Sequence, residues 1–424
     1  MMSQKYTVNL ISTYLQQLMA IVTPLILTPI MLHRMGTDMY GLWVLIGSLI
    51  GYFGLSHFGF GTTLLKELSS HNDTIVINSY LNTTIAFFVM VIMCLIPLSF
   101  FIAYAYPIWF DIQVYTTEAI NSFLILFCIF LINLLFNTFG IVLFAKGYLV
   151  YKNLISIVGY IILIIGVPFV LYKGLGIVSV ALVYLVSTVV VASLQYIYAK
   201  KNVSFVLSKK YFDKQILYSM FKPSFYYFII NIAFIVVFHT DNIVISSFLS
   251  LKLVALYAIG FKLVNVSQNI LFKIVDILVP SIAKMYSDHK YREILKLHNK
   301  IQIYSISLGI VGYGILYIYG IDIIYLWIGK DQQVLSEDVF HLIVLFGFIH
   351  NWVHTSGMFI TAMGIHKKNA YYSIYEACLN ITLSVILVHY YGLLGVALGT
   401  VLSSLLTTGW LTPRLFYKHI KMKV

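Results

Sequence analysis

Charged side chains are scarce in this sequence. Asp, Glu, Lys and Arg make up 10% of the 424 residues, hydrophobic residues make up 60%, and the mean hydropathy is +0.92. A water-soluble fold of this composition would expose large apolar patches and aggregate. The low charge content therefore excludes a soluble globular protein and indicates a protein whose surface is solvated by lipid.

Cysteines and the usual catalytic or nucleotide-binding motifs are also rare or missing. The three cysteines, Cys94, Cys128 and Cys378, lie in apolar runs, so no disulfide framework is implied. The sequence has no P-loop, no G-x-S-x-G motif, no Cys/His cluster and no segment long enough for a nucleotide-binding domain. We therefore expect no cofactor, no metal site and no catalytic residues, and the protein is expected to be neither an enzyme nor an ATP-driven pump by itself.

Long apolar runs are what the sequence does have. Each is near 20 residues or longer, which suits a membrane-spanning helix and exceeds the strands of a transmembrane barrel. A helix also satisfies its own backbone polar groups in lipid. We predict an all-α integral membrane protein with twelve spans, at 9–33, 40–65, 79–104, 119–144, 153–172, 176–199, 223–249, 254–280, 300–320, 338–363, 369–391 and 393–417. The short turns at 172–176 and 391–393 predict helical hairpins.

Proline and glycine predict bends in the first two spans. Pro24 and Pro29 lie inside the first span and should bend it. The second span carries five glycines that allow bending and close backbone approach, namely Gly47, Gly51, Gly54, Gly59 and Gly61. Bending helices would suit a lobe that rocks, and plain helix packing is the alternative.

Lysine and arginine are distributed unevenly between alternate loops. One set of loops holds 21 of the 27 cationic residues and the opposite set holds 4, while Lys262 and Lys273 fall within a span. Cytoplasmic loops carry the excess of positive charge. The distribution therefore predicts that both termini are cytoplasmic, which requires an even number of spans.

The two halves of the sequence resemble each other. Lys152-Asn153 recurs as Lys368-Asn369, and the triplet 180–182 recurs at 396–398, both with an offset of 216 residues. Since both copies begin on the same side of the membrane, we predict parallel six-helix repeats. The predicted organisation is an N-terminal lobe at 1–199, a basic cytoplasmic linker at 200–222 and a C-terminal lobe at 223–424, with the substrate path between the lobes.

Two stretches resemble a known family. Tyr40–Leu45, Gly51–Leu55 and Phe58–Thr62 are similar to the second span of Wzx-type polysaccharide flippases, and Asp241–Ile245 resembles their seventh span. These proteins share a superfamily with the MATE multidrug exporters and the lipid II flippase. The resemblance implies a MATE-like, V-shaped pair of lobes, alternating access, and an undecaprenyl-pyrophosphate-linked sugar as substrate.

Five polar residues of the predicted eighth span share one face of the helix. At 100° per residue they fall within an arc of about 80°. They are Lys262, Asn265, Asn269, Lys273 and Asp276. Ionisable residues inside membranes usually face a wet cavity, and a cationic wall would suit a pyrophosphate. The alternative is that the lysines snorkel to the membrane edge, which leaves the asparagines unexplained.

Further ionisable residues lie within predicted spans. Asp241 could pair with a lysine or take part in proton or sodium coupling. His350 and His354 lie on one face and could sense protons or bind phosphate, or simply join helices. Glu376 is the ionisable member of an otherwise neutral polar stripe and is a further candidate for ion coupling. Arg34, at the outer end of the first span, could contact a phosphate or serve as an interfacial anchor.

Together these observations predict a monomeric flippase in the bacterial inner membrane. We expect it to carry lipid-linked oligosaccharide repeat units, O-antigen or another surface polysaccharide, from the cytoplasmic to the periplasmic leaflet with ion coupling. Its expected partners are the bilayer and a polysaccharide polymerase with its chain-length regulator, and no nucleic acid. A MATE-like multidrug antiporter is one alternative, although the intramembrane lysines disfavour cationic cargo. A membrane-embedded polymerase is another, although the outer segments are too short for its usual large loop.

Overall fold

The computed structural model describes the backbone of residues 2–112 and 114–423. Side chains 2–6, 222–223, 226–227, 229–231, 233–234, 237–238 and 366 lie outside the described part. Within the described residues, all regular secondary structure is helical. Contacts divide the chain into two units, Met1–Asn231 and Ile232–Val424, and the division falls inside a single long helix, α8 (Lys214–Phe248).

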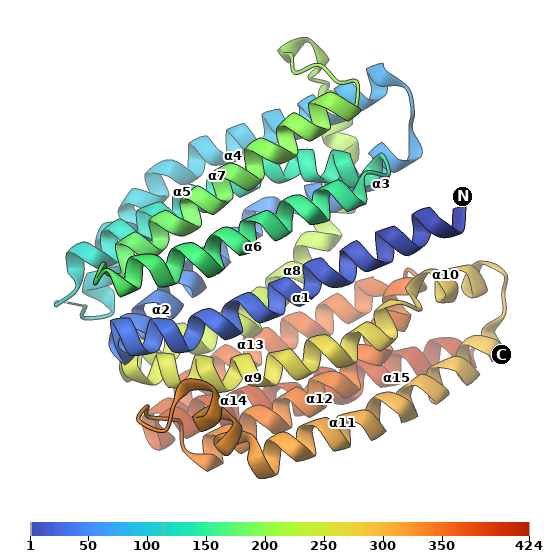
Figure 1. Cartoon of the computed structure of the whole chain (residues 1–424). Coiled ribbons are helices and arrows are strands. Elements are labelled where there is room, and N and C mark those ends of the chain that lie inside the picture. Colours follow the sequence, from blue (N-terminus) through green and yellow to red (C-terminus); the bar gives the residue numbers. More distant parts are fainter. Residues whose placement is uncertain (1, 113, 424) are drawn as a thin grey trace. The chain divides into compact units, whose positions relative to one another are not determined.

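Unit one contains seven helices before α8. They are α1 (Met2–Met35), α2 (Thr37–Phe53), α3 (Phe60–Ser70), α4 (Thr74–Trp109), α5 (Thr116–Ala145), α6 (Leu149–Tyr172) and α7 (Ile177–Asn202). Helix α5 packs against α4, α7, α2 and α3, and α6 packs against α1 and α7. Figure 1 shows α4, α5, α6 and α7 running alongside one another. This packing buries one face of each helix, and the remaining faces are left to contact lipid.

Unit two is built around one central helix. Its helices after α8 are α9 (Leu251–Asp276), α10 (Val279–Ser287), α11 (Tyr291–Ile328), α12 (Glu337–Ala362), α13 (His366–Tyr391), α14 (Leu393–Leu406) and α15 (Thr408–Lys421). Helix α12 packs against all of the other helices from α9 to α15. It is the most buried span of the described part. Polar residues of α12 therefore have to find partners inside the protein.

The structure supports a multi-pass membrane protein. Among the described residues, eleven helical segments are long and apolar enough to cross a membrane, and each overlaps one predicted span. The predicted seventh span, 223–249, falls on α8, where several side chains lie outside the described part. The two predicted hairpins are confirmed, since α6 and α7 are joined by 173–176, and α13 and α14 by Gly392.

The predicted second span, 40–65, is not one continuous helix. Helix α2 ends at Phe53, a 3-10 turn occupies Gly54–His57, and α3 begins at Phe60. Between them Phe58 and Gly59 adopt left-handed conformations, with φ of 46° and 72°. Glycine takes this conformation at little cost, and a phenylalanine does so only when its surroundings compensate. The predicted bending of this span by its glycines is therefore confirmed as a sharp break.

Two later spans are also broken. The predicted span 254–280 is α9 followed by α10, which starts with Pro280 in its first turn, where a missing N–H costs nothing. The predicted span 393–417 is α14 followed by α15, separated at Thr407. In contrast, α1 runs through Pro24 and Pro29 without interruption. Within it the Thr28 hydroxyl donates to the Pro24 carbonyl at 2.7 Å.

The predicted linker is held on unit one by side chains of α4. Asn82 donates to the Val206 carbonyl at 2.7 Å and accepts from the Ser208 backbone N–H at 2.8 Å. Asn78 accepts from the Val206 N–H at 2.8 Å. Both asparagines are buried. The backbone of the segment after α7 is therefore held against α4 by hydrogen bonds with two asparagine side chains before the chain enters α8.

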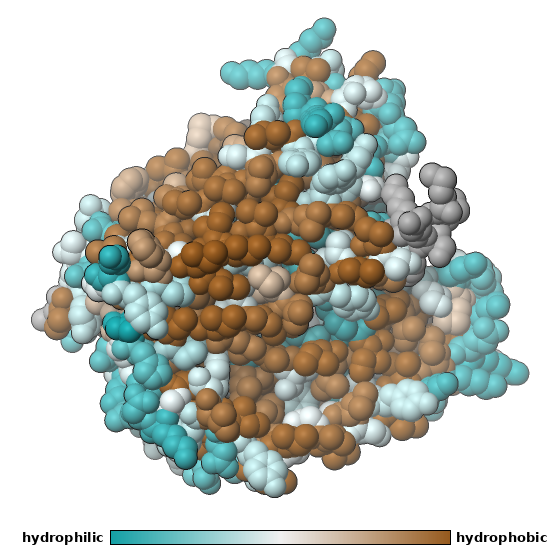
Figure 2. Space-filling model, in the orientation of Figure 1, coloured by the Kyte–Doolittle hydropathy of each residue, from teal (hydrophilic) through white to brown (hydrophobic). Residues whose placement is uncertain are grey.

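Apolar residues dominate the sides of the helices. Figure 2 shows hydrophobic side chains along the middle lengths of the helices and hydrophilic ones near the helix ends. Large apolar side chains such as Phe101, Ile165 and Ile318 are more than half exposed. Such surfaces suit lipid and not water.

Candidate functional site

The predicted polar stripe lies on α9 in unit two. Lys262 and Asn265 are half-buried, and Asn269 is exposed and donates to the Asn265 carbonyl at 2.8 Å. Lys273 and Asp276 lie one and two turns further on, at the end of α9 before the break into α10. The helix therefore presents two cations and one acid along a single side.

Asp276 joins two of the predicted candidates. Its carboxylate accepts from the Lys273 amine at 3.2 Å and from Nε2 of His354 on α12 at 3.0 Å. The exposed fraction of the side chain is 41% for Lys273, 29% for Asp276 and 17% for His354. The acid thus links α9 to α12 and compensates part of the charge of the stripe. The 100° rotation per residue predicted that Lys273 and Asp276 share one face of the helix. The hydrogen bond to His354 was not predicted.

Aromatic rings enclose the two histidines of α12. The imidazole of His354 stacks on Phe272 with centroids 3.7 Å apart and planes 7° apart. His350 meets the same Phe272 edge-on at 5.5 Å and lies over Phe346 at 5.6 Å. Stacking fixes the orientation of both rings, so His354 presents one nitrogen to Asp276.

Asp241 on α8 is enclosed by hydroxyl groups. It is 2% exposed, and its Oδ2 accepts from Tyr257 Oη on α9 and from Thr400 Oγ1 on α14, both at 2.7 Å. Ser384 of α13 lies 3.5 Å from Oδ1. No Lys, Arg or His of the described part makes an ion pair with it. The expected alternative of a lysine partner is therefore not what the described contacts show.

The polar stripe on α13 meets hydroxyl groups of the following helices. Asn380 donates to Thr400 Oγ1 at 3.0 Å, and its own Oδ1 is buried without a hydrogen-bond partner among the described residues. Glu376, 8% exposed, accepts from Thr408 Oγ1 at 2.6 Å. Asn380 thus belongs to the shell around Asp241, whereas Glu376 has a separate hydroxyl partner. The sequence pattern placed both on one face but gave no sign of Tyr257 or Thr400.

Arg34 lies at the end of α1 in unit one. Its guanidinium carbon is 4.0 Å from the centroid of the Tyr172 ring at the end of α6. With His33 and Tyr172 it borders a cavity of about 450 Å³. The stacking on tyrosine suits an interfacial anchor, and the cavity leaves the guanidinium edge beside an open space.

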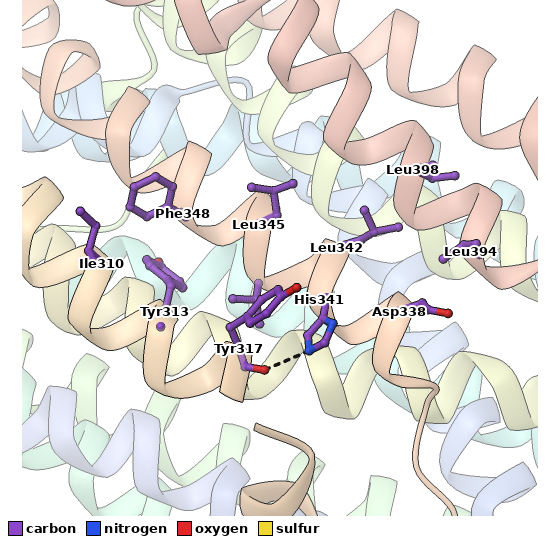
Figure 3. Close-up of a pocket in the computed structure, with 12 residues that line it drawn as sticks. Ile310, Tyr313, Tyr317, Asp338, His341, Leu342, Leu345, Phe348, Leu394 and Leu398 are labelled. Atoms are coloured by element: carbon purple, nitrogen blue, oxygen red, sulfur yellow. Dashed lines mark hydrogen bonds between the residues drawn. The ribbon is translucent and has the colours of Figure 1, made fainter. Parts of the chain in front are cut away.

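A separate apolar groove lies in unit two between α11, α12 and α14. Figure 3 shows Tyr313 and Tyr317 facing a row of leucines, with Asp338 and His341 towards one end. The groove encloses about 600 Å³, and His341 Nε2 lies 2.9 Å from the Tyr317 carbonyl oxygen. None of the predicted site residues lines it. Its chemistry fits a hydrocarbon chain better than a sugar or a phosphate.

Comparison with known sequences identifies relatives of the chain. The model of a family described as polysaccharide biosynthesis protein matches residues 2–286. A curated relative from Yersinia pseudotuberculosis, named for O-antigen export, is 23% identical over 400 residues, which cover 91% of this chain and 89% of the relative. The family resemblance expected from the second and seventh spans is confirmed.

Comparison with solved structures identifies the fold. An inward-facing MATE family multidrug resistance transporter matches with a TM-score of 0.78 and 14% identity, covering 96% of this chain and 95% of that one. The lipid II flippase MurJ in an inward closed conformation matches with a TM-score of 0.75 and 16% identity, covering 97% and 87%. The chain therefore has a MATE-like fold, as expected.

Proposed function

Because this chain belongs to the polysaccharide biosynthesis protein family, we propose that it is a flippase for undecaprenyl-pyrophosphate-linked oligosaccharide. In this proposal the protein lies in the bacterial inner membrane with both termini in the cytoplasm. It moves O-antigen or other surface-polysaccharide repeat units from the cytoplasmic to the periplasmic leaflet by alternating access. The MATE-like fold and the O-antigen export relative support this assignment.

The lysine-bearing stripe of α9 is the observation that carries the proposal. A pyrophosphate stripped of water needs replacement cations and hydrogen-bond donors. Lys262, Asn265, Asn269 and Lys273 provide both along one side of a helix. A multidrug exporter of cations would gain nothing from such lysines. Arg34 borders its own cavity and is a second candidate for contact with phosphate.

The test is translocation of a labelled polyprenyl-linked oligosaccharide in proteoliposomes. We expect charge reversal at Lys262 and Lys273 to abolish translocation while the protein still folds. The matched control is the double reversal of Lys209 and Lys210 to Glu, which makes the same charge change at two exposed residues of the linker. Translocation that survives the double reversal, or falls equally in the control, would remove the stripe from the mechanism.

Asp241 is the residue that we propose for ion coupling. A buried carboxylate without a cationic partner costs several kcal/mol unless a proton or a metal cation neutralises it. The groups that contact it are the hydroxyl oxygens of Tyr257, Ser384 and Thr400, and Asn380 is joined to this shell by its hydrogen bond to Thr400. Hard oxygen donors of this kind suit Na⁺, and a proton is the alternative. In this proposal the cation gradient drives the conformational cycle.

Ion replacement distinguishes the two cations. If Na⁺ is coupled, transport by the wild type should depend on a Na⁺ gradient at constant pH, and Asp241→Asn should remove that dependence. Glu376→Gln is the comparison variant, since it neutralises the other buried carboxyl group among the ion-coupling candidates. A response to pH alone would favour the proton, and a response to neither would remove Asp241 as the coupling residue.

The multidrug exporter remains a second candidate, because a MATE transporter is among the structures with the highest similarity. Drug resistance conferred by expression, without any change in lipid-linked sugar, would support it over the flippase. A polymerase is distinguished by its deletion phenotype, since it leaves single-repeat sugars at the surface, whereas loss of a flippase leaves lipid-linked units inside.

A further inference from the structure

Unit one contains a slot that none of the candidate site residues described above lines. It lies between α2, α5 and α7 and encloses about 440 Å³, within the usual range of about 300–1,000 Å³ for small-ligand sites. It extends along α2 and the following 3-10 turn from Trp43 to His57, a distance of about 20 Å at roughly 1.5 Å per residue. The slot therefore has room for a chain-like ligand.

The floor of the slot is a helix face without side chains. Gly47, Gly51 and Gly54 lie on one side of α2 because they are spaced at four and three residues. A Cβ added at Gly47 would meet no atom within 4 Å. Close helix packing therefore does not explain this glycine, although glycine inside a helix costs roughly 0.5–1 kcal/mol. What the glycine preserves is open volume.

Aromatic rings form the walls. Trp43 of α2 and Tyr184 of α7 lie with their centroids 5.1 Å apart and their planes tilted by 56°. At the other end the ring of His57 stands edge-on against Phe130, with centroids 6.0 Å apart. Flat apolar faces thus border the slot along its length.

Four polar side chains line the slot, namely those of Trp43, His57, Asn133 and Tyr184. Asn133 is exposed and the other three are half-buried. Their side chains offer hydrogen-bond donors and acceptors, so a ligand with hydroxyl groups would meet polar partners along the slot. No Lys, Arg, Asp or Glu is among the described residues that line the slot, which favours a neutral ligand over a charged one.

We propose that this slot binds neutral sugar rings of the lipid-linked oligosaccharide. A pyranose has apolar C–H faces that stack on aromatic rings, and hydroxyl groups at its rim that donate and accept hydrogen bonds. The walls of Trp43 and Tyr184 match the faces, and Asn133 and His57 match the hydroxyls. This inference rests on the proposed function and deepens it, since it assigns the glycan part of the substrate to a slot of unit one.

Two probes of the purified full-length protein test the proposal. One is a short-chain polyprenyl pyrophosphate that carries a neutral hexose trisaccharide, and the other is the same pyrophosphate without sugar. We expect the wild type to bind the glycosylated probe about tenfold more tightly, through stacking and hydrogen bonds. We expect Gly47→Leu, which fills the slot, and Asn133→Leu to remove this preference while binding of the sugar-free probe is unchanged.

Controls separate a binding role from a structural one. Gly312→Leu places the same side chain at a glycine of α11 where an added Cβ also meets open space, and it should alter neither affinity. Tyr184→Phe removes a single oxygen, so it keeps the test valid if the larger changes prevent folding, and it should weaken only the glycosylated probe, by a few-fold.

Specific results would overturn the proposal. Equal affinity of the wild type for both probes, or equal losses for both probes in the slot variants, would show that the slot does not bind the glycan. Tighter binding of a probe with an acidic sugar would refute a neutral site. If the wild type bound neither probe, the proposed flippase function would fail first and the slot assignment with it.

Discussion

Helices α13 and α14 approach each other more closely than any side chain would allow. A Cβ added at Gly395 would lie 2.1 Å from the Leu387 carbonyl oxygen, and one added at Gly399 would lie 2.7 Å from the Ser384 backbone nitrogen. Both obstacles are backbone atoms, so a rotamer change cannot relieve the clash. Gly395→Ala or Gly399→Ala must therefore push the two helices apart.

The size of the effect follows from these distances. Ordinary contact begins near 3.4 Å, so Gly395→Ala requires a separation of roughly 1 Å. Overpacking of this kind costs about 1–3 kcal/mol, and better helix propensity returns at most about 1 kcal/mol. A shift of roughly 1 Å would also lengthen the 3.0 Å hydrogen bond from Asn380 of α13 to Thr400 of α14 beyond the range of a hydrogen bond, and so disturb the threonine that donates to Asp241. We therefore expect lower stability and loss of the proposed ion response together.

Scanning fluorimetry in detergent, with and without Na⁺, measures both quantities. At about 2–4 °C per kcal/mol for a unit of this size, Gly395→Ala should lower the Tm by several degrees and remove stabilisation by Na⁺. Gly312→Ala is the control, because its Cβ meets open space in α11, and it should leave the Tm unchanged or slightly raised. If Gly395→Ala behaved like this control, the close approach of α13 and α14 and its role around Asp241 would both be refuted.

Three further changes test other contacts. Asn82→Ala removes two hydrogen bonds that strap the linker to α4, so trypsin should cleave the 203–213 segment faster, and unchanged cleavage would contradict the strap. Asn351→Leu removes two hydrogen bonds to Ser305 of α11 at 3.0 and 3.2 Å and should cost about 1–3 kcal/mol in thermal unfolding. Burial lowers the pKa of Lys146 below 10.5, so the unfolded chain holds more protons there and stability should rise as pH approaches 10.5. Lys146→Met, which also removes the hydrogen bond to the Leu68 carbonyl, should abolish that rise in pH-dependent unfolding.

The membrane-spanning segments could be predicted because each is an apolar run long enough to cross a bilayer. Their breaks could not be located in the same way. The glycines of the second span indicated bending. The break itself, however, depends on Phe58, which adopts a left-handed conformation and packs its ring against Phe87 and Phe228. Such compensation comes from residues distant in the sequence. The break between α14 and α15 at Thr407 likewise could not be predicted, because no residue type near Thr407 indicates it.

The candidate sites were predictable along a helix and not between helices. The 100° step per residue placed Lys273 and Asp276 on one face of α9, and the structure has them in contact. Helical phase does not say which neighbouring helix that face meets, so the link from Asp276 to His354 was missed. The hydroxyl shell of Asp241 was missed for a further reason, since threonine and tyrosine are common in such helices and carry no signal alone.

Asp276 has two opposite consequences for the proposed anion site. Its carboxylate occupies the Lys273 amine, so a pyrophosphate must compete with it for that cation. Asp276→Asn should therefore bind inorganic pyrophosphate more tightly than the wild type, while it loses stability because Lys273 and His354 no longer share a charged acceptor. Calorimetric titration measures the first effect and thermal unfolding the second. A plain ion pair outside the binding site would show the loss of stability without the gain in affinity, and that result would separate Lys273 from the head group.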